Sequence, residues 1–172
     1  MSRSLFFSTL LVCAGGLLSP SAASAQVKVG VINLQRAVLG TEEIKKASND
    51  MQAKFKPRQD ALDKLQKEMA DIQAKLQNPQ LPPVQQTDLT AEGQRKQREA
   101  QRITEDLQAD VERERNEILQ RAAQRMSEVV KKMADEKNLD LVVDTTNAVF
   151  YKPALEITEE ATSAYDKTFP VK

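Results

Sequence analysis

The pattern of apolar and polar residues predicts a β-strand over residues 27–32. Residues 27–32 read Val-Lys-Val-Gly-Val-Ile, so apolar and polar positions alternate and the segment then becomes fully apolar. This alternation places Val27, Val29 and Val31 on one face of a strand. Asn33 follows and belongs to the residue types that cap helices, so a helical turn is expected next.

A helical period replaces the strand period after residues 40–43, whose Gly-Thr-Glu-Glu sequence is typical of a helix start. From Ile44 onward the apolar residues lie three, four or seven positions apart, at Met51, Phe55, Leu62, Leu65, Met69, Ile72 and Leu76. Over 62–76 the steps alternate strictly between three and four, which predicts a seam that packs on a partner helix. Pro57 removes a backbone donor, so a kink is expected over 53–56, either as a hinge or as a static bend.

The first helix is expected to end at 78–83, where the sequence Asn-Pro-Gln-Leu-Pro-Pro cannot continue a helix. A second helix is predicted from near Thr87 or Thr90 to about Asn138. Its apolar residues repeat every eleven positions, in the series Ala100, Val111, Ala122, Met133 and the series Leu107, Ile118, Val129. Such a repeat predicts a nearly straight helix, and about 50 residues would span roughly 75 Å.

The last third of the chain returns to strand character. Leu139, Leu141 and Val143 alternate with Asp140 and then continue the apolar run, which predicts a strand. Thr-Thr-Asn at 145–147 is expected to form a tight turn into a second strand over 148–151, giving a hairpin. A final short helix is predicted to carry an apolar face made of Ile157, Ala161, Ala164 and Tyr165.

These elements predict an α+β fold with a small β-rich body and a long projecting antiparallel coiled-coil hairpin. The body would consist of residues 26–43 plus 134–172. The hairpin arm would consist of residues 44–133, with a Pro-rich tip at 78–84. A body of roughly 50 residues is too small for a robust core without disulfides or a metal. We therefore expect the chain to form an oligomer through this body.

Residues 1–25 have the three parts of a bacterial signal peptide. Arg3 supplies the positive charge, residues 5–18 the apolar stretch, and Ala-Ser-Ala at 23–25 the cleavage site. The apolar stretch is short and interrupted by Ser, Thr and Gly, so it does not predict a membrane span. We expect cleavage before Gln26 and a mature protein in the periplasm.

The composition of the mature chain excludes several kinds of chemistry. Residues 26–172 contain no cysteine, histidine or tryptophan, which excludes disulfides, thiol nucleophiles, histidine triads and Cys/His zinc sites. Without Arg3 there are 24 basic and 25 acidic residues, so the net charge of −1 gives no general attraction to nucleic acid. Asp140 and Asp144 are the acids considered for catalysis, but no base accompanies them. No enzyme activity, metal or cofactor is expected.

Four segments give the mature chain a resemblance to the Skp/OmpH family of periplasmic chaperones. They are Val-Gly-Val-Ile-Asn at 29–33, Asn-Leu-Asp-Leu-Val-Val-Asp at 138–144, Asn-Ala-Val-Phe-Tyr at 147–151, and Glu-Ile-Thr at 156–158. The resemblance covers the whole mature chain in order and size. The Leu-Val-Val-Asp strand and its return carry most of it, whereas the helical arms match only in character.

The resemblance implies a jellyfish-shaped homotrimer in which three bodies join into a small barrel and three hairpins enclose a cavity. It also implies that unfolded outer-membrane proteins are held in this cavity without ATP. The chain has no Gly-x-x-x-x-Gly-Lys-Ser/Thr phosphate loop. Under this interpretation the oligomer interface and body core are formed by Val29, Val31, Leu141, Val143 and Val149.

The chain departs from the better-known members of this family in its charge. Those members are strongly basic, especially near the arm tips. Residues 64–102 of this chain hold seven basic side chains against five acidic ones, an excess of two. The charge therefore gives little support for contact between the tips and lipopolysaccharide or an anionic membrane.

Two hypotheses about partners stay open. In the first, Met51 and Phe55 line the client cavity near the body, while the seam over 62–76 mainly packs on the returning helix. In the second, the chain is a structural adaptor or spacer that docks another envelope protein through the Pro-rich tip at 78–84.

Overall fold

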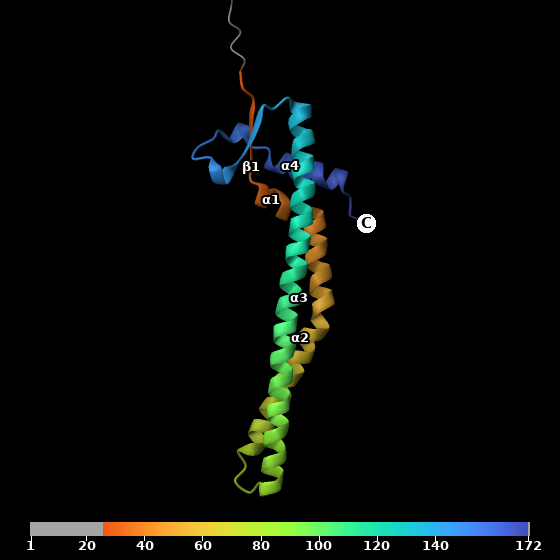
Figure 1. Cartoon of the computed structure of the whole chain (residues 1–172), viewed down its shortest axis with the longest axis vertical. Helices are drawn as coiled ribbons and strands as arrows, with labels where there is room; N and C mark the ends of the chain where they lie inside the picture. The colour runs from red at the N-terminus through yellow and green to blue at the C-terminus, as the bar shows by residue number, and fades with distance from the viewer. Residues whose placement is uncertain (1–25, 172) are drawn as a thin grey trace, which may run out of the picture.

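The computed structural model describes residues 26–171, so the predicted signal peptide, 1–25, lies outside the described residues. Two elements dominate: α2, Glu42–Leu76, and α3, Pro83–Lys137, lie side by side as a long hairpin (Figure 1). The other elements gather at one end, where α3 extends past the start of α2 (Figure 1). The described chain is therefore mostly helical, with a small body at one end of a long arm.

The body contains a sheet of two parallel strands, β1, Val29–Ile32, and β2, Leu141–Asp144. Val29 lies opposite Leu141 in the register. The parallel direction follows from the path of the chain. The helix α2 leads away from the body and α3 returns to it. Asn138 then adopts the left-handed conformation, with φ 52° and ψ 47°, and reverses the direction before β2.

The hairpin predicted over 139–151 is wrong, although its first strand forms as β2. Residues 145–147 form a short 3-10 helix, η1, Thr145–Asn147, and the described residues after it, 148–171, contain no further strand. The cause is local: the Asp144 carboxylate accepts hydrogen bonds from the N–H of Thr146 at 2.8 Å and from its hydroxyl at 2.7 Å. This side-chain cap competes with a hairpin turn and directs the chain out of the sheet.

The predicted helix starts after β1 are confirmed. The short helix α1, Leu34–Leu39, is capped by Asn33, whose Oδ1 accepts a hydrogen bond from the N–H of Arg36 at 2.8 Å. The helix α2 is capped by Thr41, whose hydroxyl accepts from the N–H of Ile44 at 3.3 Å. The two caps let the chain turn from the strand into the arm within a few residues.

Two proline positions shape the arm helices. Pro57 lies inside α2, which continues through it and curves across α3 (Figure 1). The helix α3 begins at Pro83, so the predicted start near Thr87 or Thr90 is wrong. A proline in the first turn loses no helical hydrogen bond, because the N–H groups there have no acceptor in the helix. The connecting loop is residues 77–82, shorter than the predicted tip.

The core of the body is built on the last turns of α3. Ala122 and Met126 of α3 and Tyr165 of α4, Thr158–Thr168, have no exposed surface. The whole buried cluster is Ile32, Ala37, Val38, Ala122, Met126, Val129, Met133, Ile157, Ala161 and Tyr165. Between β2 and α4 lies the 3-10 helix η2, Pro153–Leu155. The core thus includes residues of α3 that precede residue 134, the expected start of the second body segment.

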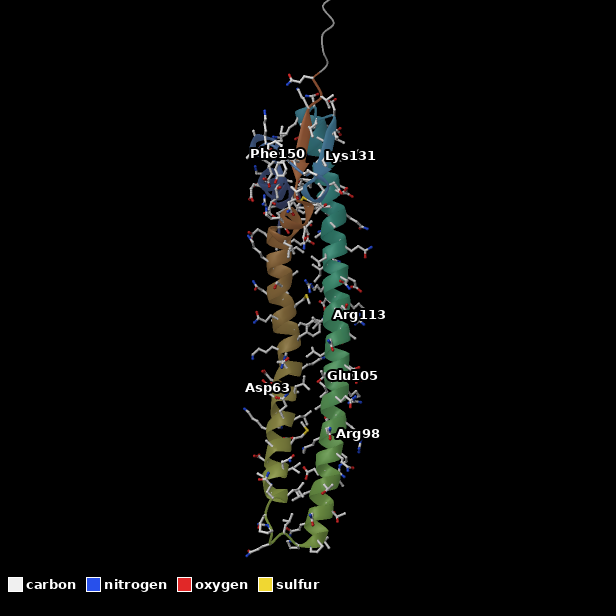
Figure 2. The ribbon with its side chains drawn as sticks, turned by 90° about the vertical axis from the view of Figure 1, so that its left-hand side faces the viewer. Asp63, Arg98, Glu105, Arg113, Lys131 and Phe150 are labelled. Carbon is white, nitrogen blue, oxygen red and sulfur yellow. The ribbon has the colours of Figure 1, made fainter. Side chains whose placement is uncertain are left out.

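The predicted seam of the arm is confirmed in the half nearer the tip. Leu62, Leu65 and Ile72 of α2 are buried, as a seam that packs on α3 requires. Charged side chains such as Asp63 and Arg98 stand along the outside of the two helices (Figure 2). The arm is therefore amphipathic, with a narrow apolar interior and a polar exterior.

Gly30→Ala should destabilise the body. The added methyl group would lie 3.0 Å from Cδ1 of Leu139 and 3.2 Å from Cδ1 of Ile157, which is tighter than ordinary packing. Overpacking of this kind costs about 1–3 kcal/mol. Urea unfolding followed by circular dichroism, at a fixed protein concentration, measures the loss in the free energy of unfolding.

Gly93→Ala is the matched control within α3. Its methyl group would lie 3.5 Å from Cγ2 of Ile72, an ordinary contact. Alanine also favours the helix over glycine, so the free energy of unfolding should rise by about 1 kcal/mol. A Gly30→Ala protein as stable as the unchanged one would contradict the tight packing around β1.

Candidate functional site

An apolar cleft of about 420 Å³ lies between α2 and α3 at the body end of the arm. Met51 and Phe55 line it from α2, and Val111 and Ile118 line it from α3. Its other lining residues are Leu39, Ile44, Ala47, Ser48, Gln52, Arg115 and Leu119. Arg115 is the one charged residue among them, so the wall is almost entirely uncharged.

The cleft exists because the seam of the arm is not filled along its whole length. Toward the tip, Leu62 and Leu65 are buried, whereas Met51, Phe55 and Ile118 remain half-buried. The predicted lining residues Met51 and Phe55 thus lie together on this cleft. It differs from the predicted cavity, which would lie between the arms of a trimer, since it separates two helices of one arm. Contact with a client stays a prediction.

The sequence interpretation missed the polar part of the lining. Ser48 and Gln52 are four residues apart, as are Met51 and Phe55, so all four share one face of α2. The sequence spacing already shows that these four residues share one face of α2. Only the position of α3 shows that this face lines the cleft and is not turned to solvent.

Cations surround the ring of Phe55 at one border of the cleft. The Nζ of Lys54 lies 5.4 Å and the Cζ of Arg58 lies 5.9 Å from the ring centroid. Each cation also crosses to α3, Lys54 to Glu114 and Arg58 to Asp110, both at 2.5 Å. The hydrogen bond from Arg58 lowers the pKa of Asp110. These pairs keep the two helices together beside the cleft.

A polar cluster joins the start of α2 to the body. Nη1 of Arg125 on α3 donates hydrogen bonds to both carboxylate oxygens of Glu43, at 3.0 and 2.8 Å. The hydroxyl of Tyr165 on α4 donates to Oε2 of Glu43 at 2.5 Å. Burial, with the nearby Glu43 carboxylate, raises the pKa of Tyr165 to about 12, so its phenol stays protonated. Three helices are therefore fixed to one another at the root of the arm.

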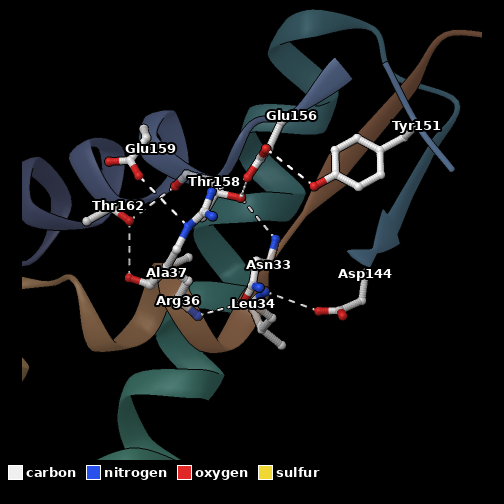
Figure 3. Close-up of polar contacts among 10 residues, drawn as sticks. All are labelled: Asn33, Leu34, Arg36, Ala37, Asp144, Tyr151, Glu156, Thr158, Glu159 and Thr162. Carbon is white, nitrogen blue, oxygen red and sulfur yellow. Dashed lines mark hydrogen bonds and ion pairs between the residues drawn. The ribbon is translucent and has the colours of Figure 1, made fainter. Parts of the chain in front are cut away.

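Further polar contacts hold the segment before α4 against β1 and α1 (Figure 3). The N–H of Asn33 donates to the hydroxyl of Thr158 at 3.0 Å. Arg36 pairs with Glu156, and the hydroxyl of Tyr151 donates to Glu156 at 3.4 Å. This network gives the body a defined shape despite its small apolar core.

The two acids considered for catalysis accept hydrogen bonds from the backbone. Oδ2 of Asp140 accepts from the N–H of Lys28 at 2.7 Å. Asp144 accepts from the N–H of Leu34 at 3.1 Å as well as from Thr146. Hydrogen bonds from the hydroxyl and the N–H of Thr146, and then from the N–H of Leu34, lower the pKa of Asp144. Both carboxylates thus serve as caps that join β2 to β1 and α1.

The predicted interface and core residues occupy different environments in the single chain. Val31 is buried, and Val29 and Val143 are half-buried. Leu141 is 52% exposed, and Val149 is fully exposed. The last two therefore lie outside the core of the single chain, and the role of these residues in an oligomer interface stays a prediction.

The outer edge of β2 is open in the described part of the chain. The other side of β1 is covered, because the N–H of Ile157 donates to the carbonyl of Val31 at 2.8 Å. No second neighbour strand lies beside β2 within residues 26–171. Phe150, 84% exposed, belongs to the same end of the molecule and was not among the predicted interface residues. The apolar run at 148–151 is the sequence feature that could have added Phe150 to the predicted interface residues.

Metal-binding and membrane-spanning features are absent from the described residues. Within 26–171, no group of three or more Cys, Asp or Glu side chains is placed to hold a metal ion. None of the helices in this range has the length and apolar character that crossing a bilayer requires. Two candidate binding surfaces on the described residues are the apolar cleft and the open edge of β2.

Comparison with known proteins finds a matching family and solved structures with a similar fold. Residues 28–165 match the family described as outer membrane protein (OmpH-like). Seven chains of solved structures match. One is a crystal structure of a candidate OmpH-like outer membrane chaperone from Caulobacter crescentus CB15. It has a TM-score of 0.63 and 19% identity, over 86% of this chain and 89% of that chain. At that identity the likeness concerns the fold. No curated protein matches.

Asp144→Asn should change how stability depends on pH. In the folded chain the pKa of Asp144 lies below its ordinary value of 3.8, so the ionised carboxylate stabilises the fold above about pH 4. This contribution is lost as the pH falls through the pKa of Asp144 in the folded chain. The melting temperature, measured at a series of pH values, should therefore fall more steeply in acid for the unchanged protein than for the variant. Asp63→Asn, on the outside of the arm, should keep the steep dependence; parallel curves for Asp144→Asn would contradict the role of its hydrogen bonds.

Proposed function

This chain belongs to the OmpH-like family, and from that premise we propose that it is an ATP-independent holdase chaperone. Its clients are unfolded outer-membrane β-barrel proteins, which it keeps from aggregating. The observation that carries the proposal is the apolar cleft at the root of the long arm, where half-buried apolar side chains remain available to a partner. The description of the Caulobacter crescentus protein as a candidate outer membrane chaperone supports the same role.

The proposed place of work is the periplasm. Residues 1–25 would direct export and would be removed before Gln26. The mature chain contains no cysteine, so oxidation of thiols would not affect it there. Clients on their way to the outer membrane cross this compartment in an unfolded state.

The proposed assembly is a homotrimer joined through the bodies, 26–43 plus 134–172, with the arms, 44–133, projecting around a cavity. A sheet of two strands is marginally stable by itself, and an open edge is a template for pairing with another chain. Leu141 and Val149 are exposed at this end of the molecule and would be buried in such an interface. Joining the bodies would thus give the small core the stability it lacks alone.

The proposed mechanism is multivalent weak binding. Each arm offers one cleft with the flexible thioether of Met51 and the ring of Phe55, which can adapt to different apolar side chains. Several arms around one client would multiply the effective affinity while each contact stays weak. Release would need no nucleotide, since each contact opens and closes on its own. Movement of the arms about Pro57 stays a prediction within this mechanism.

A second candidate function is that of a structural adaptor. The tip loop, residues 77–82, is followed by Val84, which is 73% exposed. An exposed apolar residue beside a Pro-rich turn could dock on another envelope protein. An adaptor would bind one partner in a fixed ratio, whereas a holdase would protect unrelated unfolded barrels.

The holdase proposal is tested by diluting a urea-unfolded outer-membrane β-barrel into buffer, with and without the mature protein, and following light scattering. We expect aggregation to be suppressed near one trimer per barrel, because one cavity would hold one client. Unrelated barrels should be protected as well. No suppression at any ratio, by a protein that is folded and oligomeric, would remove the holdase and leave the adaptor.

Leu141→Asp should prevent assembly. The change places a carboxylate at the proposed interface, where its desolvation is unfavourable. Light scattering coupled to size-exclusion chromatography should show the mass of a trimer for the unchanged protein and a lower mass for the variant. The matched control is Val84→Asp at the arm tip, which should keep the trimer mass. An unchanged mass for Leu141→Asp would count against the proposed interface.

A further inference from the structure

The apolar cleft does not end at Val111 and Arg115. The same two residues line a second hollow of about 670 Å³, which lies further toward the tip and has Gln59 and Gln66 in its wall. Because they share two lining residues, the two hollows adjoin along one face of the hairpin. We name them the arm groove: the lining residues of both hollows together, from Leu39 at the body to Gln66 toward the tip.

The arm groove has the length of a short extended peptide. On α3 its wall runs from Thr104 to Leu119. Fifteen helical steps of 1.5 Å give about 22 Å. An extended chain advances about 3.3 Å per residue, so roughly seven residues would fit along the groove.

The chemistry of the groove changes along its length. The body end is apolar, with Phe55 and Ile118 among its walls. The tip end presents carboxamides, including Gln59, Gln66 and Gln108. A carboxamide carries hydrogen-bond donors and an acceptor but no charge. Such groups match the N–H and C=O groups of a polypeptide main chain, which are the same in every sequence.

The opposite face of the same hairpin has a different character. Its hollow, of about 580 Å³, is lined by Arg58, Asp110 and Arg113, and both arginines donate hydrogen bonds to Asp110 at 2.5 Å. In the arm groove the charged residues are one acid, Glu112, and one base, Arg115. Ion pairs thus occupy one face of the arm, whereas the groove face offers uncharged polar and apolar groups.

We propose that the arm groove binds an extended segment of about seven residues of an unfolded outer-membrane polypeptide, with one bulky apolar side chain of that segment in the body-end cleft. This inference rests on the proposed holdase function and assigns the client contact to one face of each arm. The carboxamides hydrogen-bond the client main chain, and Met51 adapts to the apolar side chain that enters. The groove therefore accepts many sequences that combine an extended backbone with a bulky apolar residue.

Photo-cross-linking in the assembled mature protein tests whether the client contacts the groove face of the arm. The photoreactive residue p-benzoylphenylalanine replaces Gln59 or Gln108 in the groove, and Ala61 or Asp106 on the opposite face. All four positions are exposed, so the replacements are matched in their effect on folding. With a urea-unfolded outer-membrane β-barrel as the client, the groove positions should give several-fold more cross-linked product.

The apolar end is tested by filling it. Ser48→Phe adds a ring in the cleft that competes with the client side chain, and Ala61→Phe adds the same ring on the opposite face. The Kd for the unfolded barrel should rise about tenfold for Ser48→Phe, as expected when one buried apolar side chain is displaced. It should stay unchanged for Ala61→Phe.

The outcomes separate this inference from the proposed function. If the unchanged protein does not hold the barrel, both are overturned. If it holds the barrel but the two faces cross-link equally, the groove is overturned and the holdase function stands. Equal Kd values for Ser48→Phe and the unchanged protein overturn the apolar anchor in the body-end cleft.

Discussion

The structure depends on one helix that serves two parts of the molecule. The last turns of α3 end the arm and also form the centre of the body, where Ala122 and Met126 are fully buried. The strand β1, the short helix α1 and the C-terminal helix α4 gather around these turns (Figure 1). Because the same rigid helix belongs to both parts, the direction of the arm is set by the packing of the body.

The cluster around Glu43 extends this constraint to the second arm helix. Glu43 lies in the first turn of α2, and its carboxylate accepts hydrogen bonds from Arg125 of α3 and Tyr165 of α4. The helix α2 is thus fixed at its root by polar contacts and nearer the tip by the seam at Leu62 and Leu65. Between these two points the side chains do not fill the space, and the apolar cleft results. A hollow in a helical pair is unfavourable for stability, since apolar side chains there lose packing contacts.

The candidate site could be predicted in part. Met51 and Phe55 stand on the apolar stripe of α2 before the strict seam, and both line the apolar cleft, whereas their contact with a client stays a prediction. The polar wall of the groove could not be predicted, because Gln59, Gln66 and Gln108 are ordinary exposed positions in a helical sequence. Their common feature is that they border the same depression on two antiparallel helices. That depends on the register between α2 and α3, which the length of the tip loop and the packing of the body decide together.

The sequence by itself determined the features that arise within a few residues. The caps at Asn33 and Thr41, the seam over 62–76 and the amphipathic final helix follow from local hydrogen bonds and from the 3.6-residue period. Tertiary structure decided what depends on distant partners. The segment after Asp144 was expected to fold back as a strand beside 139–144, but β2 takes β1, more than a hundred residues earlier, as its neighbour. The backbone N–H and C=O groups of a strand pair with a neighbouring strand, so the whole fold decides which segment that is. In a helix these groups pair within the same segment.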